Sequence, residues 1–455
     1  LFFYGQLYMM GVQAWLAAPV FLWLGPTVFA LKLPLLVLNV VTGGLLIRLL
    51  VRDAGLRAWQ AVVATAWFAW LPPVTASRMV QAQGGTIEPL LYTLLLWMLR
   101  RRAVAFGLLF AFGFLQREFT VFAVIALVLL EGWTGELFSK RRAAHWMVVA
   151  LVFLGAREGV TLLRHTASMF GPDAAPPRLE DGVTNVDLVA SSVCLAPGHV
   201  IGNIGWLLGQ NVPTFFGAQV QPPGILILSG APTGAVWAGV PALIGVITAL
   251  FIVGRRGVGW LPPLRVPDDS RVLLPVLLIV TGALGLAGVA SGCSIRSLIT
   301  IRYHLLLALA PVGLTALAFV LQSSVREEPQ SRRRLPATVM AAATLCWAAA
   351  MGWQHARLWQ EYRVAPPPSH YRALADDLVA HGDRYGWASY WVSYHVDFLS
   401  REQVQLSPTS AIRINEYARQ ALRLGPKATV VGSDPCDKGD DARRAGVWWV
   451  CRKPR

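Results

Sequence analysis

The stretch that decides the fold is YHLLLALAPVGLTALAFVL, residues 303–321, which carries no acidic side chain, lysine or arginine. Comparable apolar runs lie at Leu33–Leu46 and Ala235–Val253. Runs of this kind are typical of segments that cross the hydrocarbon core of a bilayer, which is about 30 Å thick. Because lipid offers the backbone no hydrogen bonds, each run is predicted to be a helix.

The composition supports the same fold class. Hydrophobic residues make up 55% of the 455-residue chain and charged residues only 14%, whereas a soluble protein of this length needs more charge to cover its surface. The net charge is +15, but the basic residues stand in short clusters between apolar runs, which is typical of topology signals rather than of a nucleic-acid surface. We therefore predict an all-α polytopic protein of the cell (inner) membrane, with membrane lipids as neighbours and no nucleic-acid partner.

The basic clusters predict the orientation, since positive residues favour the cytoplasmic ends of spans. The clusters are Arg48/Arg52/Arg57, Arg100–Arg102, Lys140–Arg142, Arg255–Arg256 and Arg332–Arg334. When all five are placed inside, ten spans alternate in direction without contradiction. These spans are 27–50, 58–76, 86–99, 103–116, 119–134, 145–165, 234–253, 271–290, 302–321 and 337–353.

Two features depart from a plain bundle. The run Tyr8–Leu24 would break the alternation if it crossed the membrane, so we expect it to be a helix lying at the outer interface. The spans at 86–99, 103–116 and 119–134 are shorter than the ~20 residues that a crossing usually needs. They indicate a thinned or cavity-lining outer region.

The predicted organisation has three parts. Residues 1–26 form an outer interfacial segment, residues 27–353 form the transmembrane domain with a Pro- and Gly-rich outer loop at 166–233, and residues 354–455 form an extracytoplasmic domain. In this last part, Tyr371–Ala380 has helical spacing and 428–431 and 447–450 have the composition of short strands. A small C-terminal α/β domain is therefore expected outside the membrane.

The cysteines and the start of the chain add two expectations. Cys194 and Cys293 both fall in segments placed outside, as do Cys436 and Cys451, so either couple could pair in an oxidising compartment. Cys346, in an apolar run, is expected to be inert packing. The chain starts at Leu1 with neither a methionine nor a signal sequence, so we expect that residues are missing before it.

Ionisable residues inside spans cost roughly 2.5–3.5 kcal/mol and are functional candidates for that reason. All of them are predicted toward the outer ends of their spans, which implies a shared cavity open to the outside. Plainer roles stay open: Glu88 could favour a helix dipole, Arg117-Glu118 could be an exposed turn, and Arg157-Glu158 and Arg302 could reach the interface. The candidates are Lys32, Glu88, Arg117, Glu118, Arg157, Glu158, Arg302 and His304.

Several kinds of chemistry find no support in the sequence. The histidines and cysteines lack metal-ligand spacing, so no metal site is predicted. No phosphate-binding glycine loop and no G-x-S-x-G motif is present. Nucleotide-driven chemistry is therefore not expected, and an enzyme acting at the outer face would need a substrate carried by a lipid.

Several ordered motifs resemble those of the membrane-embedded GT-C glycosyltransferases. The closest resemblance is to the dolichyl-phosphate-mannose–protein mannosyltransferases and the aminoarabinose transferases that modify lipid A. It covers most of the chain in scattered blocks of moderate specificity, and their order carries more weight than any single block. The blocks are FYGQLYM (3–9), RMVQAQGGTIEP (78–89), NIGWLLGQNVPTFFGA (203–218), IRYHLLLALAP (301–311) and YWVSYHVDFLSREQVQLSP (390–408).

The resemblance implies a GT-C-like helical bundle and an inverting transfer of a sugar from a polyprenyl phosphate to an acceptor at the outer face. Such a reaction needs a carboxylate base on the acceptor hydroxyl and cations on the departing lipid phosphate. The family's base is an Asp in the first outer loop, but residues 1–52 contain no Asp or Glu. By this resemblance, the base is expected upstream of residue 1.

The remaining roles follow from position in the matching blocks. Glu88 matches the family's second acidic position, near acceptor or sugar, and is the catalytic candidate of this chain. Arg117 and Arg302 match positions that would hold the donor phosphate, although Gln116-Arg117-Glu118 departs from the commonest pattern. No organic cofactor is implied; some relatives bind a divalent metal near the phosphate, but no ligand set here demands one. Other cavity candidates are Tyr4, Gln6, Gln83, Glu118 and Tyr303.

Two other classes of function stay open at this level. A transporter or lipid flippase would use the same charges to line a path, but it should carry them at mid-depth and between symmetric halves. A non-catalytic membrane scaffold would bind partners through its outer tail. The sugar, the prenyl chain and the acceptor are not identified by the sequence.

Overall fold

The computed structural model describes residues 2–3, 6–81, 87–167, 191–224, 227–257, 270–293, 296–323, 330–410 and 412–453. The chain divides into two units. We call one the helical unit (Lys32–Glu158 and Asn185–Ala365) and the other the mixed unit (Leu1–Leu31, Gly159–Thr184 and Pro366–Arg455). Each unit is described by itself.

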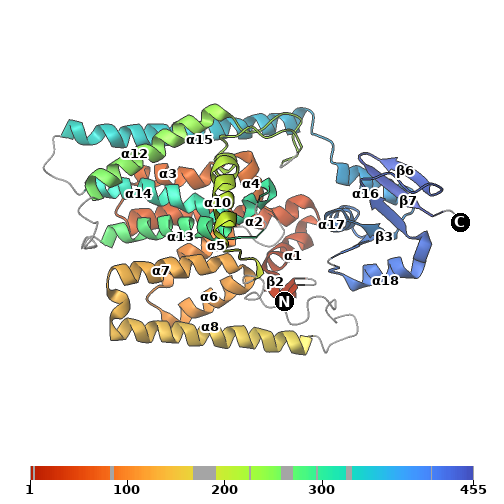
Figure 1. Ribbon diagram of the computed structural model, residues 1–455, viewed down its shortest axis with the longest axis horizontal. Helices are drawn as coiled ribbons and strands as arrows, with labels where there is room; N and C mark the ends of the chain where they lie inside the picture. The colour runs from red at the N-terminus through yellow and green to blue at the C-terminus, as the bar shows by residue number, and fades with distance from the viewer. Residues whose placement is uncertain are drawn as a thin grey trace. The chain divides into compact units, whose positions relative to one another are not determined.

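Six helices in the described part of the chain are long and apolar enough to cross a membrane. They correspond to six of the ten predicted spans, and in Figure 1 the long helices of the helical unit run roughly along one direction. The segments are Val28–Arg52, Lys140–Val160, Val236–Arg255, Ser270–Ala290, Leu305–Ser323 and Leu335–Val364. They belong to α2 (Val28–Arg52), α8 (Lys140–Ala167), α12 (Gly239–Gly257), α13 (Leu273–Ala290), α14 (Leu309–Ser323) and α15 (Gln330–Val364).

The other four predicted spans are helical but short. They are α3 (Ala58–Ala69), α5 (Glu88–Leu99), α6 (Ala103–Gln116) and α7 (Val121–Trp133). The single helix predicted over 58–76 is wrong, because the chain breaks at Trp70–Pro72 and resumes as α4 (Pro73–Met79), with Pro73 in its first turn. At 12 to 14 residues, α5, α6 and α7 are about 18–21 Å long.

The predicted outer loop contains helices that the sequence did not indicate. It holds α10 (Pro197–Trp206), a π-helical turn, η3 (Leu207–Asn211), and α11 (Val212–Phe215). Short 3-10 turns punctuate the rest of the unit. They are η1 (Glu118–Thr120), η2 (Glu136–Phe138), η4 (Val236–Ala238), η6 (Ser270–Val272), η7 (Leu298–Tyr303) and η8 (Leu305–Ala308).

The core of the helical unit is aromatic and tightly packed. The rings of Trp67 and Trp347 stack with centroids 4.4 Å apart, and Trp67 Nε1 donates to Thr315 Oγ1 over 3.0 Å. Gly313 lets α14 approach α13, since a Cβ there would lie 2.5 Å from the carbonyl oxygen of Pro275. Close backbone approach through small residues is typical of helix packing in membranes.

The mixed unit contains the C-terminal sheet, whose strand order is β4-β3-β5-β7-β6. Strand β3 pairs in parallel with β4 and β5, while β7 pairs antiparallel with β5 and β6. The strands are β3 (Tyr385–Ala388), β4 (Gln405–Pro408), β5 (Thr429–Gly432), β6 (Asp441–Ala445) and β7 (Trp448–Arg452). The helices are α16 (His370–Ala380), α17 (Tyr390–Leu399) and α18 (Asn415–Leu424), with the 3-10 turn η9 (Gly425–Lys427).

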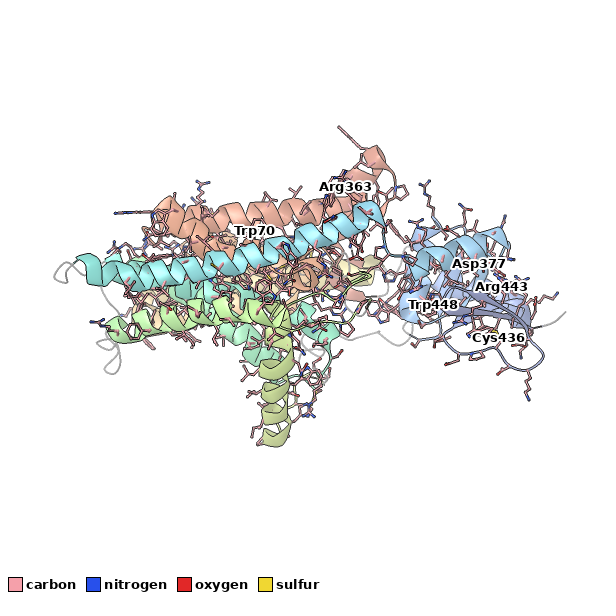
Figure 2. The ribbon with its side chains drawn as sticks, turned by 90° about the horizontal axis from the view of Figure 1, so that it is seen from above. Trp70, Arg363, Asp377, Cys436, Arg443 and Trp448 are labelled. Carbon is pink, nitrogen blue, oxygen red and sulfur yellow. A yellow bond between two sulfur atoms is a disulfide. The ribbon has the colours of Figure 1, made fainter. Side chains whose placement is uncertain are left out.

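The predictions for this region are confirmed in part. The helix expected over Tyr371–Ala380 is α16, and the two expected strands are β5 and β7. The transmembrane helix predicted to end at 353 instead continues to Val364, because its polar last turns carry no helix breaker before Pro366. Figure 2 shows Asp377, Arg443 and Trp448 in the sheet region, along with Cys436, which forms a disulfide with Cys451.

The amino-terminal part of the mixed unit has a short hairpin before its helix. Strands β1 (Phe2–Phe3) and β2 (Gln6–Met10) are antiparallel, and α1 covers Val12–Leu24. The helix expected from Tyr8 therefore starts four residues later, after Gly11. The ring of Phe21 in α1 lies 6.3 Å from that of Phe398 in α17, so α1 packs on the C-terminal sheet domain.

Candidate functional site

A buried carboxylate marks the start of α5. Glu88 is 1% exposed, and its Oε1 accepts a hydrogen bond of 2.9 Å from Gln116 Nε2 at the end of α6. Tyr92, one turn further along α5, donates from its hydroxyl to Gln116 Oε1. Because α5 and α6 form an antiparallel hairpin through Arg100–Arg102, these polar groups lie at the end of the hairpin opposite to the arginines.

Arg117 joins this carboxylate to other charged groups. It follows α6 directly and interacts electrostatically with Glu118, Tyr303, Glu88 and Arg302. The sequence predicted Glu88, Arg117, Glu118, Arg302 and Tyr303 as site residues from segments far apart in the chain. The structure brings these five together at one end of the helical unit.

Arg302 and Tyr303 end the 3-10 turn η7. The guanidinium of Arg302 donates to the Tyr303 hydroxyl over 2.6 Å and lies 4.7 Å from the ring centroid. The Tyr303 ring in turn packs on Phe119, with centroids 5.8 Å apart. Arg78 of α4 interacts electrostatically with Arg302, so a third guanidinium reaches the group. We call Arg78, Glu88, Tyr92, Gln116, Arg117, Glu118, Arg302 and Tyr303 the Glu88 cluster.

A second polar layer lies beside Arg302, and of its members only His304 was among the predicted candidates. The buried ring of His304 is 3.4 Å from Asn211 Nδ2, which also donates to Thr300 Oγ1 over 3.3 Å. Asn211 reaches these partners from the π-helical turn, and such turns often occur at functional sites. The stretch NIGWLLGQN carries no proline or charge that would have indicated the turn.

A disulfide closes the same end of the helical unit. Cys194 is bonded to Cys293, and the backbone pairs Cys194–Ser291 and Cys293–Ser192 surround the bridge. Asn203 of α10 donates to the carbonyl oxygens of Ala290 and Gly292, each over 2.9 Å. The segment before α10 is therefore attached to the end of α13, one short loop away from Arg302.

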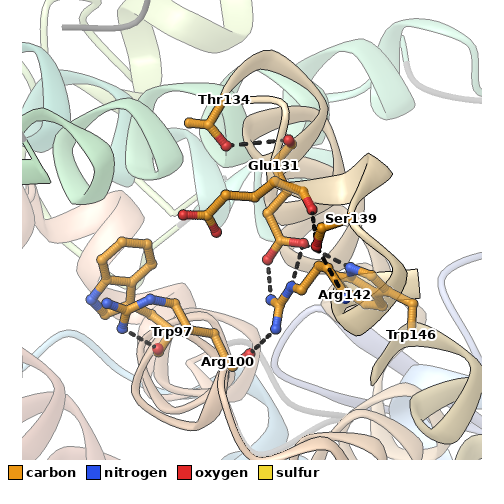
Figure 3. Close-up of polar contacts among 8 residues, drawn as sticks. Trp97, Arg100, Glu131, Thr134, Ser139, Arg142 and Trp146 are labelled. Carbon is orange, nitrogen blue, oxygen red and sulfur yellow. Dashed lines mark hydrogen bonds and ion pairs between the residues drawn. The ribbon is translucent and has the colours of Figure 1, made fainter. Parts of the chain in front are cut away.

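The opposite end of the helical unit holds a different arrangement, shown in Figure 3. Arg142 forms two bonds with the Glu131 carboxylate, one of them Nε to Oε2 over 2.7 Å, and Trp146 Nε1 donates to the same carboxylate over 2.7 Å. Arg142 also donates to the carbonyl oxygen of Arg100 over 2.8 Å. We call Arg100, Glu131, Arg142 and Trp146 the Glu131 cluster.

Other basic residues gather at that end. Trp97 Nε1 donates to Asp53 over 2.7 Å, and Asp53 pairs with Arg52. Arg271 lies against Gly55, where a Cβ would be 2.9 Å from its Cδ. Three of the five predicted clusters, those around Arg52, Arg100 and Arg142, thus share one end, as the sequence predicted.

Three of the other predicted cavity residues do not belong to either cluster. Tyr4 and Gln83 lie outside the described residues. Gln6 belongs to β2 of the mixed unit. Cys346, expected to be packed, is exposed on α15, because it faces away from the buried Trp347 side of the helix.

Among the described residues no three His, Cys, Asp or Glu side chains gather as a metal site. The Glu88 cluster offers two carboxylates, Glu88 and Glu118, and three guanidinium groups. Guanidinium groups suit phosphate oxygens, which they can bind in pairs. No protein-family model matches the chain, and no curated protein matches it significantly.

Proposed function

We propose that the helical unit is embedded in the cell (inner) membrane, with the Glu88 cluster at the outer face. The six long apolar helices support this proposal. The Glu131 cluster and its basic neighbours would lie at the cytoplasmic end, as expected for positive residues. The Cys194–Cys293 bridge lies at the other end, and disulfides persist in oxidising, extracytoplasmic compartments.

The mixed unit fits the same orientation. Its Cys436–Cys451 disulfide also calls for an oxidising compartment. The apolar helix α1 exposes Leu22 and Trp23, which suits a helix lying at a membrane interface. Because α1 contacts α17, the interfacial segment and the C-terminal domain would share the extracytoplasmic side.

We further propose that the protein transfers a sugar from a polyprenyl phosphate to an acceptor at the outer face, with inversion. The observation that carries the proposal is the meeting of Arg117 and Arg302 with Glu88, from three separate segments of the chain. Arg78 adds a third guanidinium beside Arg302. Guanidinium groups gathered in this way suit the oxygens of a lipid phosphate, which they can bind in pairs.

Each part of the Glu88 cluster has a role in this chemistry. Negative charge grows on the phosphate as the bond to the sugar breaks, and Arg117 and Arg302 would stabilise it. Gln116 holds one oxygen of Glu88 and so orients the carboxylate toward acceptor or sugar.

The test is a transfer assay on the full gene product, expressed with any residues that its gene encodes before Leu1. The protein is placed in nanodiscs with a series of polyprenyl-phosphate sugars, and release of polyprenyl phosphate is measured. Arg302→Gln and Arg117→Gln should each lower kcat by about 10²–10³-fold. Arg101→Gln, which changes an exposed arginine at the opposite end, serves as the matched control and should retain full activity.

Two outcomes would count against the enzyme. If no donor of the series is consumed by folded protein, the transfer reaction is rejected. If the vesicle-reconstituted protein moves the sugar lipid between leaflets without releasing polyprenyl phosphate, the flippase is the better description. Equal activity of Arg302→Gln and Arg101→Gln would show that Arg302 of the Glu88 cluster takes no part in the transfer.

A further inference from the structure

The short helix α10 has a different direction from the long helices of the helical unit. Figure 1 shows it running across them, and Figure 2 shows it, in pale yellow-green, standing out from the side of the bundle. With 10 residues it is about 15 Å long, too short to cross a bilayer core of about 30 Å. A helix in this direction lies along the surface of a membrane that the long helices cross.

One face of α10 is attached to the end of α13. Asn203 donates to the carbonyl oxygen of Ala290 over 2.9 Å. The buried side chain of Leu207, directly after α10, packs with Val289 and Ala290. Ala290 is also the last residue of the candidate span Ser270–Ala290. The helix is therefore held at the level where α13 would leave the hydrocarbon core.

The opposite face of α10 is apolar and exposed. Ile201, Ile204 and Leu208 are 69%, 42% and 60% exposed, and their spacing of three and four residues places them on one side of the helix. We call these three residues the α10 stripe. Residues 195–212 contain no Asp, Glu, Lys or Arg. Aliphatic side chains gathered in this way are typical of a surface that another apolar medium covers.

The position of the α10 stripe favours lipid as that medium. A helix that lies at a membrane surface buries its apolar face about 5–10 Å into the boundary between headgroups and acyl chains. The helix α10 has the direction, the level and the lack of acidic and basic residues that such burial requires. A lipid surface therefore fits the stripe in all three respects.

A guanidinium group borders the stripe. Arg296, in the loop after α13, is exposed, and its Nε donates to Asn203 Oδ1 over 3.4 Å. Its Nη2 lies against Gly202, which has no side chain and leaves room for the guanidinium along the flank of α10. Because Gly202 follows Ile201, this cation stands at the edge of the apolar face, where a basic side chain reaches the headgroups of a bilayer.

The charge of this surface favours an anionic headgroup. The two segments that form it, 191–224 and 273–303, contain no Asp or Glu, so neither segment supplies an acidic residue to neutralise Arg296. Lipids such as phosphatidylglycerol carry a net negative charge, which attracts basic side chains at a membrane surface. Their phosphodiester group also offers oxygens in the geometry that a guanidinium binds.

We propose that α10 lies on the outer leaflet, with its stripe among the acyl chains and Arg296 on the phosphate of an anionic phospholipid. This inference rests on the proposed membrane embedding and goes beyond the transfer reaction, since neither the stripe nor Arg296 belongs to the Glu88 cluster. The helix continues through the π-helical turn to Asn211, which bonds Thr300 two residues before Arg302. Contact with lipid thus holds the polar layer beside Arg302 in place.

The experiment measures local contact with lipid by fluorescence quenching in nanodiscs. In a chain with Cys346→Ala, bimane is attached without reductant to Ile201→Cys, or to Leu208→Cys as a second probe of the stripe. In a mixture of phosphatidylglycerol and phosphatidylcholine, the acyl chains of one lipid or the other carry bromine, which quenches bimane on contact. Ile247→Cys, on the exposed face of α12 within a candidate span, is the positive control. Gln360→Cys, at an exposed position near the end of α15, is the negative control.

Bromine should quench the stripe probes and the Ile247 probe and leave the Gln360 probe bright. At the stripe, phosphatidylglycerol should be preferred over phosphatidylcholine by about fivefold in relative affinity. Arg296→Gln should abolish that preference. Arg363→Gln, which changes an exposed arginine elsewhere in the helical unit, is the matched control and should retain it.

Three results would overturn the proposal. The first is quenching at Ile247 without quenching at either stripe position of the folded chain. The second is disulfide cross-linking between the Ile201→Cys residues of two chains together with loss of lipid quenching, which would assign the stripe to a second copy. The third is equal quenching by the two brominated lipids, or a preference that Arg296→Gln leaves unchanged. Absence of quenching at Ile247 as well would reject the proposed embedding and this inference with it.

Discussion

The two ends of the helical unit each bury a glutamate, and they treat it differently. Glu131 is 6% exposed and is bonded by the guanidinium of Arg142 and the indole of Trp146. Glu88 is 1% exposed, and a neutral amide, Gln116, holds one of its oxygens. In the first arrangement Arg142 neutralises the Glu131 carboxylate through a direct ion pair. In the second, Gln116 orients the Glu88 carboxylate through a neutral hydrogen bond, with several arginines nearby.

The difference indicates two kinds of role. A buried ion pair adds little net stability to a protein. Removing one of its partners is nevertheless strongly destabilising, because it leaves an uncompensated buried charge. Glu88 is bonded by a neutral amide and interacts electrostatically with Arg117, within a group of ionisable residues of the kind that gathers at functional sites. We therefore expect changes in the Glu131 cluster to affect stability and changes in the Glu88 cluster to affect reaction.

The largest expected effect concerns sidedness, because it is all-or-none. In a chain with Cys346→Ala, a cysteine is introduced at Arg101 or at Gln360, both exposed. A membrane-impermeant maleimide should label Arg101→Cys only from the cytoplasmic side of sealed vesicles and Gln360→Cys only from the opposite side. If the maleimide labelled both cysteines from one side, the two positions would lie on the same side of the membrane. The proposed sidedness of the two ends would then be wrong.

The next largest effects are expected from two glutamine substitutions, one in each cluster, which should affect stability and activity in opposite ways. Glu131→Gln should lower the free energy of unfolding by about 3 kcal/mol, since it leaves Arg142 buried without its counter-charge, while activity per folded molecule is retained. Glu88→Gln should do the reverse and leave thermal unfolding almost unchanged. Adding Arg142→Gln to Glu131→Gln should cost less than the sum of the single changes, and additive losses would contradict the ion-pair role.

A similar contrast in the mixed unit predicts a pH effect of moderate size. Asp383 pairs with Arg443 and Arg452, whereas burial raises the pKa of Asp397 from 3.8 to about 8, opposed by the Leu406 backbone N–H and reinforced by Glu402. The folded domain keeps this proton up to about pH 8 and the unfolded chain loses it near pH 4. The free energy of unfolding of the domain therefore falls as the pH rises from about 4 to about 8. The Asp397 carboxyl contributes up to ~1.4 kcal/mol of this fall per pH unit.

Asp397→Asn should remove this pH-dependent part of the free energy of unfolding. Hydrogen exchange of peptides covering α17 and β4 measures it locally, because the Leu406 amide donates to Asp397 Oδ1 over 2.7 Å. The difference in protection between wild type and variant should change across pH 4–8 and be constant above pH 8. A difference independent of pH over the whole range would show that Asp397 is ionised in the folded domain.

The smallest expected effect is that of Tyr92→Phe. Loss of the hydroxyl that holds Gln116 should weaken the orientation of Glu88 by about 0.5–1.5 kcal/mol, a two- to tenfold fall in kcat/KM. If Tyr92 acts through Gln116 and Glu88, the substitution should have no further effect in a Glu88→Gln background. An undiminished effect in that background would show that Tyr92 acts on its own.

Much of the architecture could be predicted from local pattern. Long runs such as residues 303–321 indicated helices, and the basic clusters indicated a shared end, which the Arg142–Arg100 contact supports. The break at Pro72-Pro73 and the extension of α15 to Val364 were missed. Both follow from local sequence, the proline pair in one case and the lack of a helix breaker before Pro366 in the other, and hydrophobic periodicity reports neither.

The charged members of the candidate site and their meeting at one end were predicted from the sequence, but the uncharged groups that bond to them were not. Glu88, Arg117 and Arg302 stood out because ionisable groups are costly in apolar segments. Gln116 and Asn211 did not, since uncharged amides are common and their role depends on a partner far away in the chain. The strands β3, β4 and β6 were also missed, because each is four or five residues long and takes its register from its neighbours.

The sequence by itself determined the apolar helices, the side on which the basic residues gather and the residue types available for chemistry, because these depend on composition and on neighbours along the chain. Only the tertiary structure decided which carboxylate is paired with an arginine and which is bonded by an amide. Those outcomes depend on contacts between residues 11 and 28 positions apart. Such contacts form when whole helices pack, and packing is a property of the folded chain as a unit.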